Sequence, residues 1–447
     1  MKKGFYQPYF ENKKITIMGL GLLGRGLQVT KFLTECKAKV TVTDLKNEKD
    51  LAISLKKLKG YKIKYVLGKH NLEDFENTDL VIKSAGVPLD SPFIKHARLN
   101  KIPVAMDASI FAKIVSKVEP KITIIGITGT RGKSMTTALI YHILSQNEAN
   151  FGCKVHLGGN MRMKATLPIL SILKPKDIVV LELDSWQCQG FGDEKISPHI
   201  SVFTNLMSDH MNYYKGSMKK YLTDKENIFK FQNKNDILVT DKENLKTFIN
   251  KPKSKIIIAN IKNVPKITMN IFGQHNIKNI SYAYSVAKEL GLSDTEIIKT
   301  LKSFGGLEGR LQYIGKTKEV LVINDNNATT PEATVAGIKS VYQKYGKKFI
   351  LICGGADKGL KISDFAKNIK KYCKKVVLIP GNGTERLKKL LKNYIEEKNM
   401  KSIISESFLT TKKNDVILFS PGFASFGLFK NEYDRNDQFL NLIKKWK

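Results

Sequence analysis

The 447-residue sequence predicts an α/β fold, because short β-branched runs alternate with helical patterns along most of the chain. Three of these runs are followed at once by glycine-rich or polar turns, at residues 19–24, 129–134 and 354–359. In open α/β sheets, ligands bind at such strand ends. A chain of this length also exceeds one hydrophobic core. The length suggests two to four domains, and the α/β pattern falls into three regions: a Rossmann-like unit at each end and a P-loop type unit between them.

The most informative stretch is a phosphate loop in the middle region. Ile122 to Ile127 predicts a buried strand, Met135 to Leu144 predicts a helix, and Gly129-Thr-Arg-Gly-Lys-Ser134 joins them. Glycines let backbone N–H groups converge on phosphate oxygens, and the helix N-terminus adds a partial positive charge. Lys133 would bridge the β- and γ-phosphates, and the Ser134 hydroxyl would ligate Mg²⁺. The loop predicts ATP and Mg²⁺ as cofactors.

This loop is shorter than the general P-loop pattern. That pattern requires a glycine five residues before Gly132, where the chain has Ile127. The alternative is an ordinary strand-to-helix turn. The phosphate-binding interpretation is favoured because strand, loop and helix follow one another in register.

The first region matches a dinucleotide-binding fingerprint. A strand, a glycine turn, a helix and a second strand follow one another in residues 14–18, 19–24, 27–36 and 39–43. Asp44 then supplies an acid about twenty residues after the glycines. NAD is one interpretation, but any nucleotide with a diphosphate and a ribose could use the same turn. A second tight turn, Ser84-Ala-Gly86, follows the strand predicted from Leu80 to Ser84.

Three polar residues of the middle region lie within or directly after apolar strands. Glu182 lies in the strand predicted from Asp177 to Leu183, where an ionised carboxylate is costly unless it meets a cation. It is interpreted as a Mg²⁺ ligand, with a salt-bridged structural acid as the alternative. Asp209 and His210 follow the strand predicted from Ile200 to Asn205 and would face the same crevice. The alternative that His210 has only a structural role stays open.

The remaining elements continue the α/β pattern. Helices are predicted over 219–231, 277–290, 294–303 and 331–345, and strands over 319–324, 348–353, 375–379 and 415–419. The stretch from Asp241 to Ala259 is predicted to alternate strand and loop.

The composition bears on the protein's binding partners and on its cellular compartment. The formal charge of +34 could suggest nucleic acid or a membrane surface, but lysine is spread over the chain, so neither partner is predicted. A nucleic-acid-binding ATPase stays as an alternative on charge alone. The odd number of cysteines, five, without a CxxC pair, predicts reduced thiols. No apolar run has the length of a signal core or a membrane span, which predicts a cytoplasmic protein.

Taken in order, the motifs resemble those of the Mur ligases and span nearly the whole chain. They are Gly19-x-Gly21, Gly129-Thr-Arg-Gly-Lys-Ser134, Gly158-Gly-Asn160, Glu182-Leu-Asp-Ser-Trp-Gln187, Asp209-His210, Lys225, Gly273-Gln-His275-Asn276…Asn279, Arg310, Asn324-Asp325…Thr329, Gly354-Gly-Ala-Asp-Lys358 and Ser420-Pro…Ser425-Phe. The last two motifs favour the D-glutamate-adding branch.

The resemblance implies an enzyme of three domains. Residues 1–110 would bind a UDP-linked substrate, 111–307 would bind ATP, and 308–447 would bind the incoming amino acid. The implied reaction is ATP-dependent amide formation between UDP-N-acetylmuramoyl-L-alanine and D-glutamate through an acyl phosphate. It serves peptidoglycan precursor synthesis, and the enzyme is expected to be a monomer. The alternative is a folylpolyglutamate- or cyanophycin-type ligase with another acceptor.

The resemblance also implies site residues. The catalytic residues are Lys133, Glu182, His210 and Lys225. ATP would contact Gly129, Thr130, Arg131, Gly132, Lys133, Ser134, Asn279, Arg310 and Asp325. The UDP-linked substrate would contact Gly19, Asp44, Leu45, Lys46, Ser84 and Asn160, and glutamate would contact Thr329, Lys358, Ser425 and Phe429. Mg²⁺ would be held by Ser134, Glu182, His210 and Lys225. Because a lysine cation cannot ligate a metal, the resemblance implies that Lys225 is carbamylated.

The chain departs from the family pattern at several positions. Arg131 stands where Asn is more frequent, Asp184 replaces Ser, Gly309 replaces His, and Asn327 replaces Lys. The Asn160 loop continues Met-Arg-Met instead of Ile-Gly. None of these changes removes a group that the implied mechanism requires.

Overall fold

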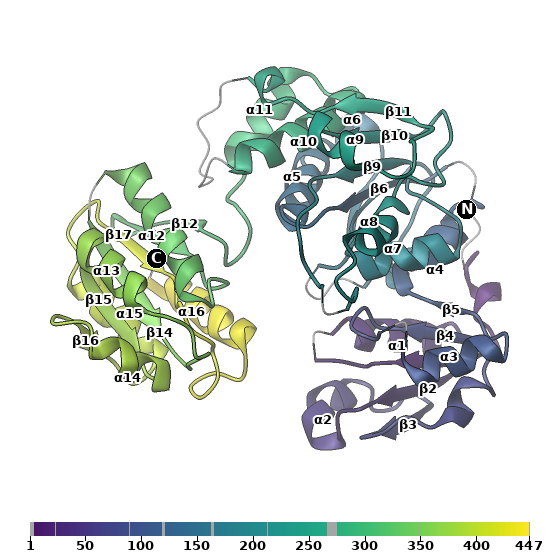
Figure 1. Cartoon of the computed structure of the whole chain (residues 1–447), viewed down its shortest axis with the longest axis horizontal. Helices are drawn as coiled ribbons and strands as arrows, with labels where there is room; N and C mark the ends of the chain where they lie inside the picture. The colour runs from purple at the N-terminus through teal and green to yellow at the C-terminus, as the bar shows by residue number, and fades with distance from the viewer. Residues whose placement is uncertain are drawn as a thin grey trace. The chain divides into compact units, whose positions relative to one another are not determined.

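The computed structural model describes residues 4–22, 24–88, 90–118, 121–161, 165–211, 213–265, 275–346 and 348–446. The chain forms two compact units (Figure 1). The first comprises Met1–Lys266 with Ile277–Leu301, and the second comprises Ile267–Asn276 with Lys302–Lys447. The predicted α/β fold is confirmed, with three mainly parallel sheets.

The first unit begins with a five-stranded parallel sheet of order β3-β2-β1-β4-β5. Its strands are β1 (Lys14–Met18), β2 (Lys39–Asp44), β3 (Ile63–Leu67), β4 (Leu80–Lys83) and β5 (Val104–Ala105). Its helices are α1 (Arg25–Glu35), α2 (Glu48–Lys57), α3 (Pro92–Leu99) and α4 (Asp107–Val115), with short 3₁₀ turns at Gln7–Tyr9 and Leu72–Phe75. The glycine turn after β1 and the turn after β4 lie at the same edge, because parallel neighbours end together.

A six-stranded parallel sheet of order β11-β10-β9-β6-β8-β7 completes the first unit. Its strands are β6 (Thr123–Thr128), β7 (Val155–Gly159), β8 (Ile178–Glu182), β9 (Ile200–Phe203), β10 (Ile237–Thr240) and β11 (Lys255–Ile258). Its helices are α5 (Lys133–Ser145), α6 (Glu148–Phe151), α7 (Ser185–Asp193), α8 (Met218–Glu226), α9 (Lys242–Thr247), α10 (His275–Glu289) and α11 (Asp294–Ser303), with 3₁₀ turns at Leu167–Ser171 and Ile261–Asn263. The central strand β6 leads into the phosphate loop.

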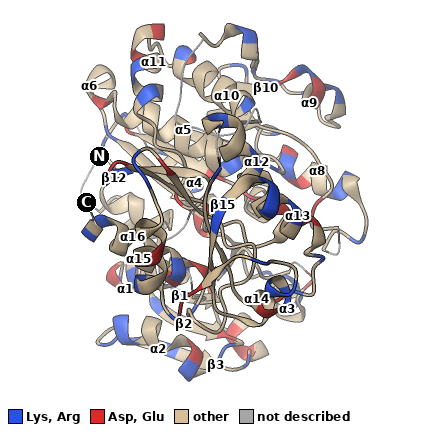
Figure 2. Ribbon diagram, turned by 90° about the vertical axis from the view of Figure 1, so that its left-hand side faces the viewer, with Lys and Arg blue, Asp and Glu red and all other residues tan. Residues whose placement is uncertain are grey.

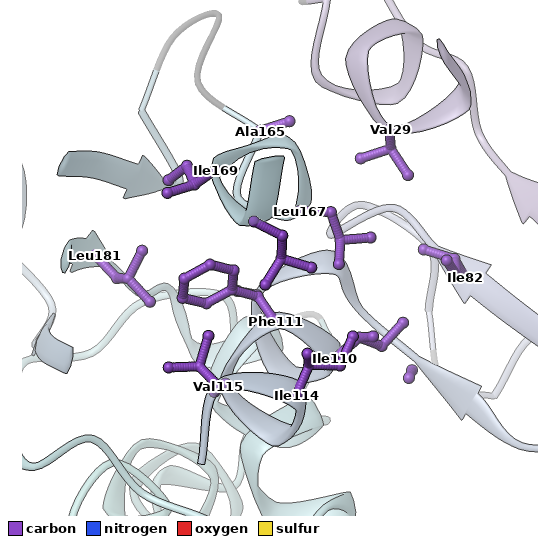
Figure 3. Close-up of a cluster of buried hydrophobic side chains, with 14 of the residues drawn as sticks. Val29, Ile82, Ile110, Phe111, Ile114, Val115, Ala165, Leu167, Ile169 and Leu181 are labelled. Carbon is purple, nitrogen blue, oxygen red and sulfur yellow. The ribbon is translucent and has the colours of Figure 1, made fainter. Parts of the chain in front are cut away.

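The two sheets of the first unit share one hydrophobic core (Figure 3). Helix α4 supplies Phe111, which is fully buried on the side of Leu167 and Leu181 of the second region, while Ile82 of the first sheet belongs to the same cluster. The predicted boundary after residue 110 lies inside this helix. The domain bounds at 110 and 307 stay predictions.

The second unit holds a six-stranded sheet of order β12-β13-β17-β14-β15-β16, parallel except for the β12–β13 pair. Its strands are β12 (Gln312–Thr317), β13 (Val320–Asn324), β14 (Phe349–Gly354), β15 (Cys373–Ile379), β16 (Ile395–Glu396) and β17 (Val416–Phe419). Its helices are α12 (Pro331–Tyr345), α13 (Ser363–Tyr372), α14 (Asn382–Lys388), α15 (Met400–Leu409) and α16 (Glu432–Trp446).

Two predicted elements differ from the structure. The helix predicted to reach Phe231 ends at Glu226, because the following turns bury Ile228 and Phe229 in the core. Within the stretch predicted as strand and loop, Asp241 caps helix α9 by accepting a hydrogen bond from the Asn244 N–H. The strands β3, β7, β10, β12 and β16 were not among the predicted elements.

Basic residues are spread over the chain, and its cysteines are unpaired. Figure 2 shows lysine and arginine positions on helices throughout the chain, including α2 and α13. All five cysteines are free thiols. Within the described ranges, no helix combines the length and apolar character needed to cross a membrane.

Replacing Phe111 by Ala should destabilise the first unit by about 3–5 kcal/mol, because the change removes a fully buried ring from the shared core. Urea unfolding followed by Trp186 fluorescence in a Trp446→Phe background measures this. Leu99→Ala is the matched control, because Leu99 is 82% exposed. Equal losses from the two variants would contradict the shared core.

Candidate active site

The phosphate loop runs from the end of β6 to the start of α5 and requires glycine at two positions. Gly129 has φ +142° and Gly132 has φ +82°, both in the left-handed region. A Cβ on Gly129 would collide with Thr204 Oγ1, and one on Gly132 would collide with Asn279 Oδ1. The structure therefore brings Asn279, from α10, directly against the loop, and its contact with ATP stays a prediction.

The segment after β9 holds the loop in place. The N–H groups of Thr130 and Arg131 donate to the backbone oxygen and side-chain Oδ1 of Asn205, at 2.9 and 2.8 Å. Thr204 Oγ1 donates to the Arg131 carbonyl oxygen at 2.7 Å. Because these bonds form within the protein, the loop is preorganised.

Two lysine side chains converge on one carbonyl oxygen of this loop. Lys133 Nζ lies 3.1 Å from the Gly129 carbonyl oxygen, and Lys225 Nζ lies 2.8 Å from the same atom. Lys225 is only 1% exposed. Burial, with the nearby charge of Lys133, lowers the pKa of Lys225 to about 8. Within the described part of the chain, neither ammonium group forms a salt bridge, so the loop presents positive charge suited to an anion.

Glu182 and Asn160 lie at the strand ends beside the loop. Glu182 ends β8 and is in register with Ile127 of β6. The Asn160 N–H donates to the Glu182 carbonyl oxygen at 2.7 Å, which places Asn160 at the same edge. Glu182 is buried. The structure thus brings Asn160, Glu182 and the phosphate loop to one sheet edge.

His210 is linked to the loop through its neighbour. Arg131 Nη1 lies 2.7 Å from Asp209 Oδ2 in a salt bridge. Burial alone would raise the pKa of Asp209, but the Arg131 hydrogen bond and the nearby His210 hold it below its ordinary value. The imidazole of His210 is 40% exposed, and its ring centroid lies 4.7 Å from that of Trp186. Arg131 therefore connects the loop to the His210 segment.

The donor set beside the loop fits Mg²⁺ bound together with a nucleotide. Ser134 provides a hydroxyl and Glu182 a carboxylate, both hard oxygen donors. Among the described residues, no group of three or more His, Cys, Asp or Glu side chains could hold a metal. Mg²⁺ commonly takes one or two carboxylates and completes its shell with phosphates and water. The residues thus suit a metal that arrives with phosphates.

In the first sheet, the predicted substrate residues lie around the glycine turn. Ser84 Oγ donates to the Gly19 carbonyl oxygen at 2.7 Å. The carboxylate of Asp44 accepts from the N–H groups of Gly21 and Lys46, at 3.0 and 2.9 Å. Leu45 is 69% exposed, which leaves an apolar side chain beside the turn. These contacts join both predicted turns into one strand-end surface.

In the second unit, three loops meet at the ends of β13, β14 and β17. Lys358 Nζ lies 3.1 Å from Thr329 Oγ1. Backbone bonds join Ala356 with Ala424 and Gly422 with Ala328. Ser425 and Phe429 are both buried, and Phe429 packs in the core of this unit. Thr329, Lys358 and Ser425 thus belong to one loop cluster.

Asp325 lies buried at the base of that cluster, whereas Arg310 is exposed. Ser420 Oγ donates to Asp325 Oδ2 at 2.7 Å, and the Leu311 N–H donates to Oδ1 at 3.1 Å. Burial raises the pKa of Asp325 to about 7 in spite of these bonds.

Several departures from the family pattern have structural explanations. Gly309 has φ +71°, and a Cβ at this position would lie only 2.9 Å from Asn327 Oδ1. Glycine at position 309 therefore leaves room for asparagine at position 327. Asp184 caps α7 by accepting from the Gln187 N–H at 2.7 Å. Parts of two motifs, Gly273-Gln274 and Arg162-Met163, lie outside the described residues.

The sequence prediction missed two arginines that lie beside predicted site residues, one in each unit. Arg25 Nη1 donates to Asn160 Oδ1 at 2.7 Å. Arg435 of α16 is fully buried, and its Nε, Nη1 and Nη2 donate to Asn326 Oδ1, the Phe423 carbonyl and the Asn326 carbonyl. It thereby ties together the loops of Asp325 and Ser425. The position of Arg25 directly after the glycine turn was a usable signal, but Arg435 carried none.

Asp325→Asn should raise the unfolding temperature of the second unit by several degrees at pH 8 and by much less at pH 5. The pKa of Asp325 is higher in the folded state than in the unfolded state, so folding favours the protonated carboxyl. The stability that this carboxyl contributes is therefore fully present below about pH 4 and is lost as the pH rises through 7. Asparagine is neutral at both values: its Oδ1 can accept from the Leu311 N–H, and its amide N–H can donate to Ser420 Oγ, which then donates to Thr334 Oγ1. Calorimetry at the two pH values measures the difference, and the same increment at both would contradict the assignment.

Comparisons with known proteins agree over the whole chain. Family models described as "Mur ligase MurD-like, N-terminal domain", "Mur ligase middle domain" and "Mur ligase, glutamate ligase domain" match residues 13–106, 127–265 and 309–423. The UDP-N-acetylmuramoylalanine–D-glutamate ligase of Borreliella burgdorferi is 33% identical, over 97% of this chain and 98% of the relative. The ligase of that name from Streptococcus mutans is 31% identical, with 98% of both chains covered.

A solved structure supports the fold. The UDP-N-acetylmuramate-alanine ligase MurC of Thermotoga maritima aligns with a TM-score of 0.60 at 21% identity, covering 98% of this chain and 100% of that chain. Three family models match successive parts of the chain, and relatives at more than 30% identity cover nearly all of it. The chain belongs to the Mur ligase family.

Proposed function

We propose that this protein is an ATP-dependent ligase that joins D-glutamate to the L-alanine carboxylate of UDP-N-acetylmuramoyl-L-alanine. The observation that carries this proposal is the phosphate loop, where Lys133 and the buried Lys225 meet one carbonyl oxygen beside Glu182. The near-full-length similarity to ligases of that name supports the choice of substrates. We assign the reaction to peptidoglycan precursor synthesis in the cytoplasm, carried out by a monomer.

The chemistry begins with a carboxylate, which is a poor electrophile. Transfer of the ATP γ-phosphoryl group to a carboxylate oxygen forms an acyl phosphate and releases ADP. The amine of glutamate then attacks the acyl carbon and loses a proton, and inorganic phosphate leaves with one former carboxylate oxygen. Such transfers depend mainly on positioning and on neutralised charge.

The residues of the loop suit the first step. Lys133 and the loop N–H groups would hold the phosphates, and the Thr204 and Asn205 contacts keep the loop in shape. Ser134 and Glu182 would hold Mg²⁺, which supplies positive charge to the transferring group. Asn279 lies against Gly132, where the nucleotide would pass. Arg310 and Asp325 of the second unit would complete the nucleotide contacts.

Lys225 has the properties of a lysine that reacts with carbon dioxide. Carbamylation requires the neutral amine, and burial lowers the pKa of Lys225 to about 8. The amine nitrogen adds to CO₂ and loses a proton, which leaves a carbamate anion on the side chain. A carbamate on Lys225 would remove the electrostatic repulsion between two cations at the Gly129 carbonyl oxygen. Together with His210, this carbamate would hold a second Mg²⁺.

The substrate contacts are divided between the two units. Gly19, Asp44, Leu45, Lys46 and Ser84 would bind the uridine diphosphate, and Asn160 would touch the muramoyl group. Within the second unit, Thr329, Lys358 and Ser425 would bind the glutamate carboxylates, with Phe429 packed nearby. A lysine suits a substrate that carries two negative charges.

Phosphate release measured with single amino acids tests the function. The protein should release phosphate with ATP, Mg²⁺ and UDP-N-acetylmuramoyl-L-alanine only when D-glutamate is added. Release with L-glutamate, lysine or diaminopimelate instead would overturn the amino-acid assignment. Release with a folate acceptor in place of the UDP-linked substrate would favour a folylpolyglutamate-type ligase.

Lys225→Ala should lower kcat by roughly 100-fold or more, because it removes the anionic ligand proposed beside the loop. Added formate or acetate should restore part of the activity by supplying a carboxylate in the space left by the side chain. Lys219→Ala, an exposed lysine on the same helix, is the control and should keep full activity. Wild-type activity in Lys225→Ala would refute the proposed role.

A further inference from the structure

Helix α1 starts in an electrostatically unusual way. It begins at Arg25, directly after the glycine turn, and its first turn contains no acidic residue. A helix N-terminus carries partial positive charge, so a cation at the first position is unfavourable unless an anion is bound there. Helical side chains also lean toward the N-terminus, which directs Arg25 over that end. The sequence therefore places two sources of positive charge where a Rossmann-like turn binds a diphosphate.

Arg25 also links the two sheets of the first unit. Its Nη1 donates to Asn160 Oδ1 at 2.7 Å, from the first sheet region to the second. On the far side of the same loop, Gln28 Oε1 accepts from the Ala165 N–H at 2.9 Å and Asp107 Oδ2 accepts from the Thr166 N–H at 3.0 Å. Both described ends of the Asn160 loop are thus held by residues of α1 and α4.

A small cavity of about 60 Å³ lies at this junction, and its wall includes Arg25, Lys83, Ser84, Asp107 and Gln187. Lys83 is only 4% exposed, and its Nζ donates to the Val87 carbonyl oxygen at 3.3 Å. In the described ranges, neither Arg25 nor Lys83 forms a salt bridge. Two cations and one acid therefore line the cavity, which leaves its wall net positive.

We propose that Arg25 is a further substrate-binding residue, which pairs with the diphosphate of the nucleotide-linked substrate while it holds Asn160. The inference rests on the proposed function, because that function supplies a diphosphate at this turn. A guanidinium has five N–H donors, and the described structure uses one of them, on Asn160. The remaining donors suit phosphate oxygens, which guanidinium groups bind in a forked geometry. Arg25 thereby joins the nucleotide anchor to the loop beside the phosphate site.

Titration calorimetry of the full chain with UDP, together with an NMR titration with uridine, tests this assignment. Arg25→Gln should weaken UDP binding roughly 10- to 100-fold, the usual value of a hydrogen bond between charged groups. It should leave uridine binding unchanged, because uridine lacks the diphosphate. Lys31→Gln removes one positive charge from the exposed face of the same helix and should bind UDP like the wild type.

A second comparison separates direct contact from an effect through Asn160. If Arg25 touches the diphosphate, Arg25→Gln should weaken UDP binding in the Asn160→Ala background as well. No further loss in that background, an equal loss of uridine affinity, or unchanged UDP binding in Arg25→Gln would each overturn the inference. The last result would leave the proposed function intact, whereas failure of the wild type to bind UDP would overturn both.

Discussion

Two positive side chains meet at the carbonyl oxygen of Gly129, and the rest of the site follows from that contact. Lys133 reaches it from the start of α5, and Lys225 reaches it from the buried end of α8. Two cations held this close in a dry environment are costly without an anion. The loop glycines, the Thr204 and Asn205 bonds and the core behind β6 keep the arrangement in place. A phosphate, and a carbamate on Lys225, would each supply the negative charge that it lacks.

Parallel sheets explain why distant parts of the chain collaborate at this point. The carboxyl ends of β6, β7, β8 and β9 present the phosphate loop, Asn160, Glu182 and the Thr204 segment at one edge. The core around Phe111 fixes this sheet against the first one, so that Arg25 can reach Asn160. The second unit repeats the principle with three loops, of which Arg435 ties together the two that follow β13 and β17.

Local patterns predicted much of the fold. The ranges of β1, α11 and α12 coincide with the predicted ones, because strand periodicity, helix amphipathicity and Pro331 at a first helical position are local signals. The predicted C-terminal end of α8 was wrong, because packing in the core and not local propensity decides that Ile228 and Phe229 are buried. Residues that act across elements, such as Arg435 and the Gly309–Asn327 pair, became visible only in three dimensions.

In the proposed reaction, the loop delivers a phosphoryl group to a carboxylate and not to water. Substrate labelled with ¹⁸O in both oxygens of the L-alanine carboxylate tests this, with the released phosphate analysed by mass spectrometry. One ¹⁸O atom should appear in the phosphate for each amide formed, because the oxygen that bridges carbon and phosphorus in the acyl phosphate leaves with the phosphate. Phosphate without ¹⁸O, released while amide accumulates, would contradict the proposed reaction.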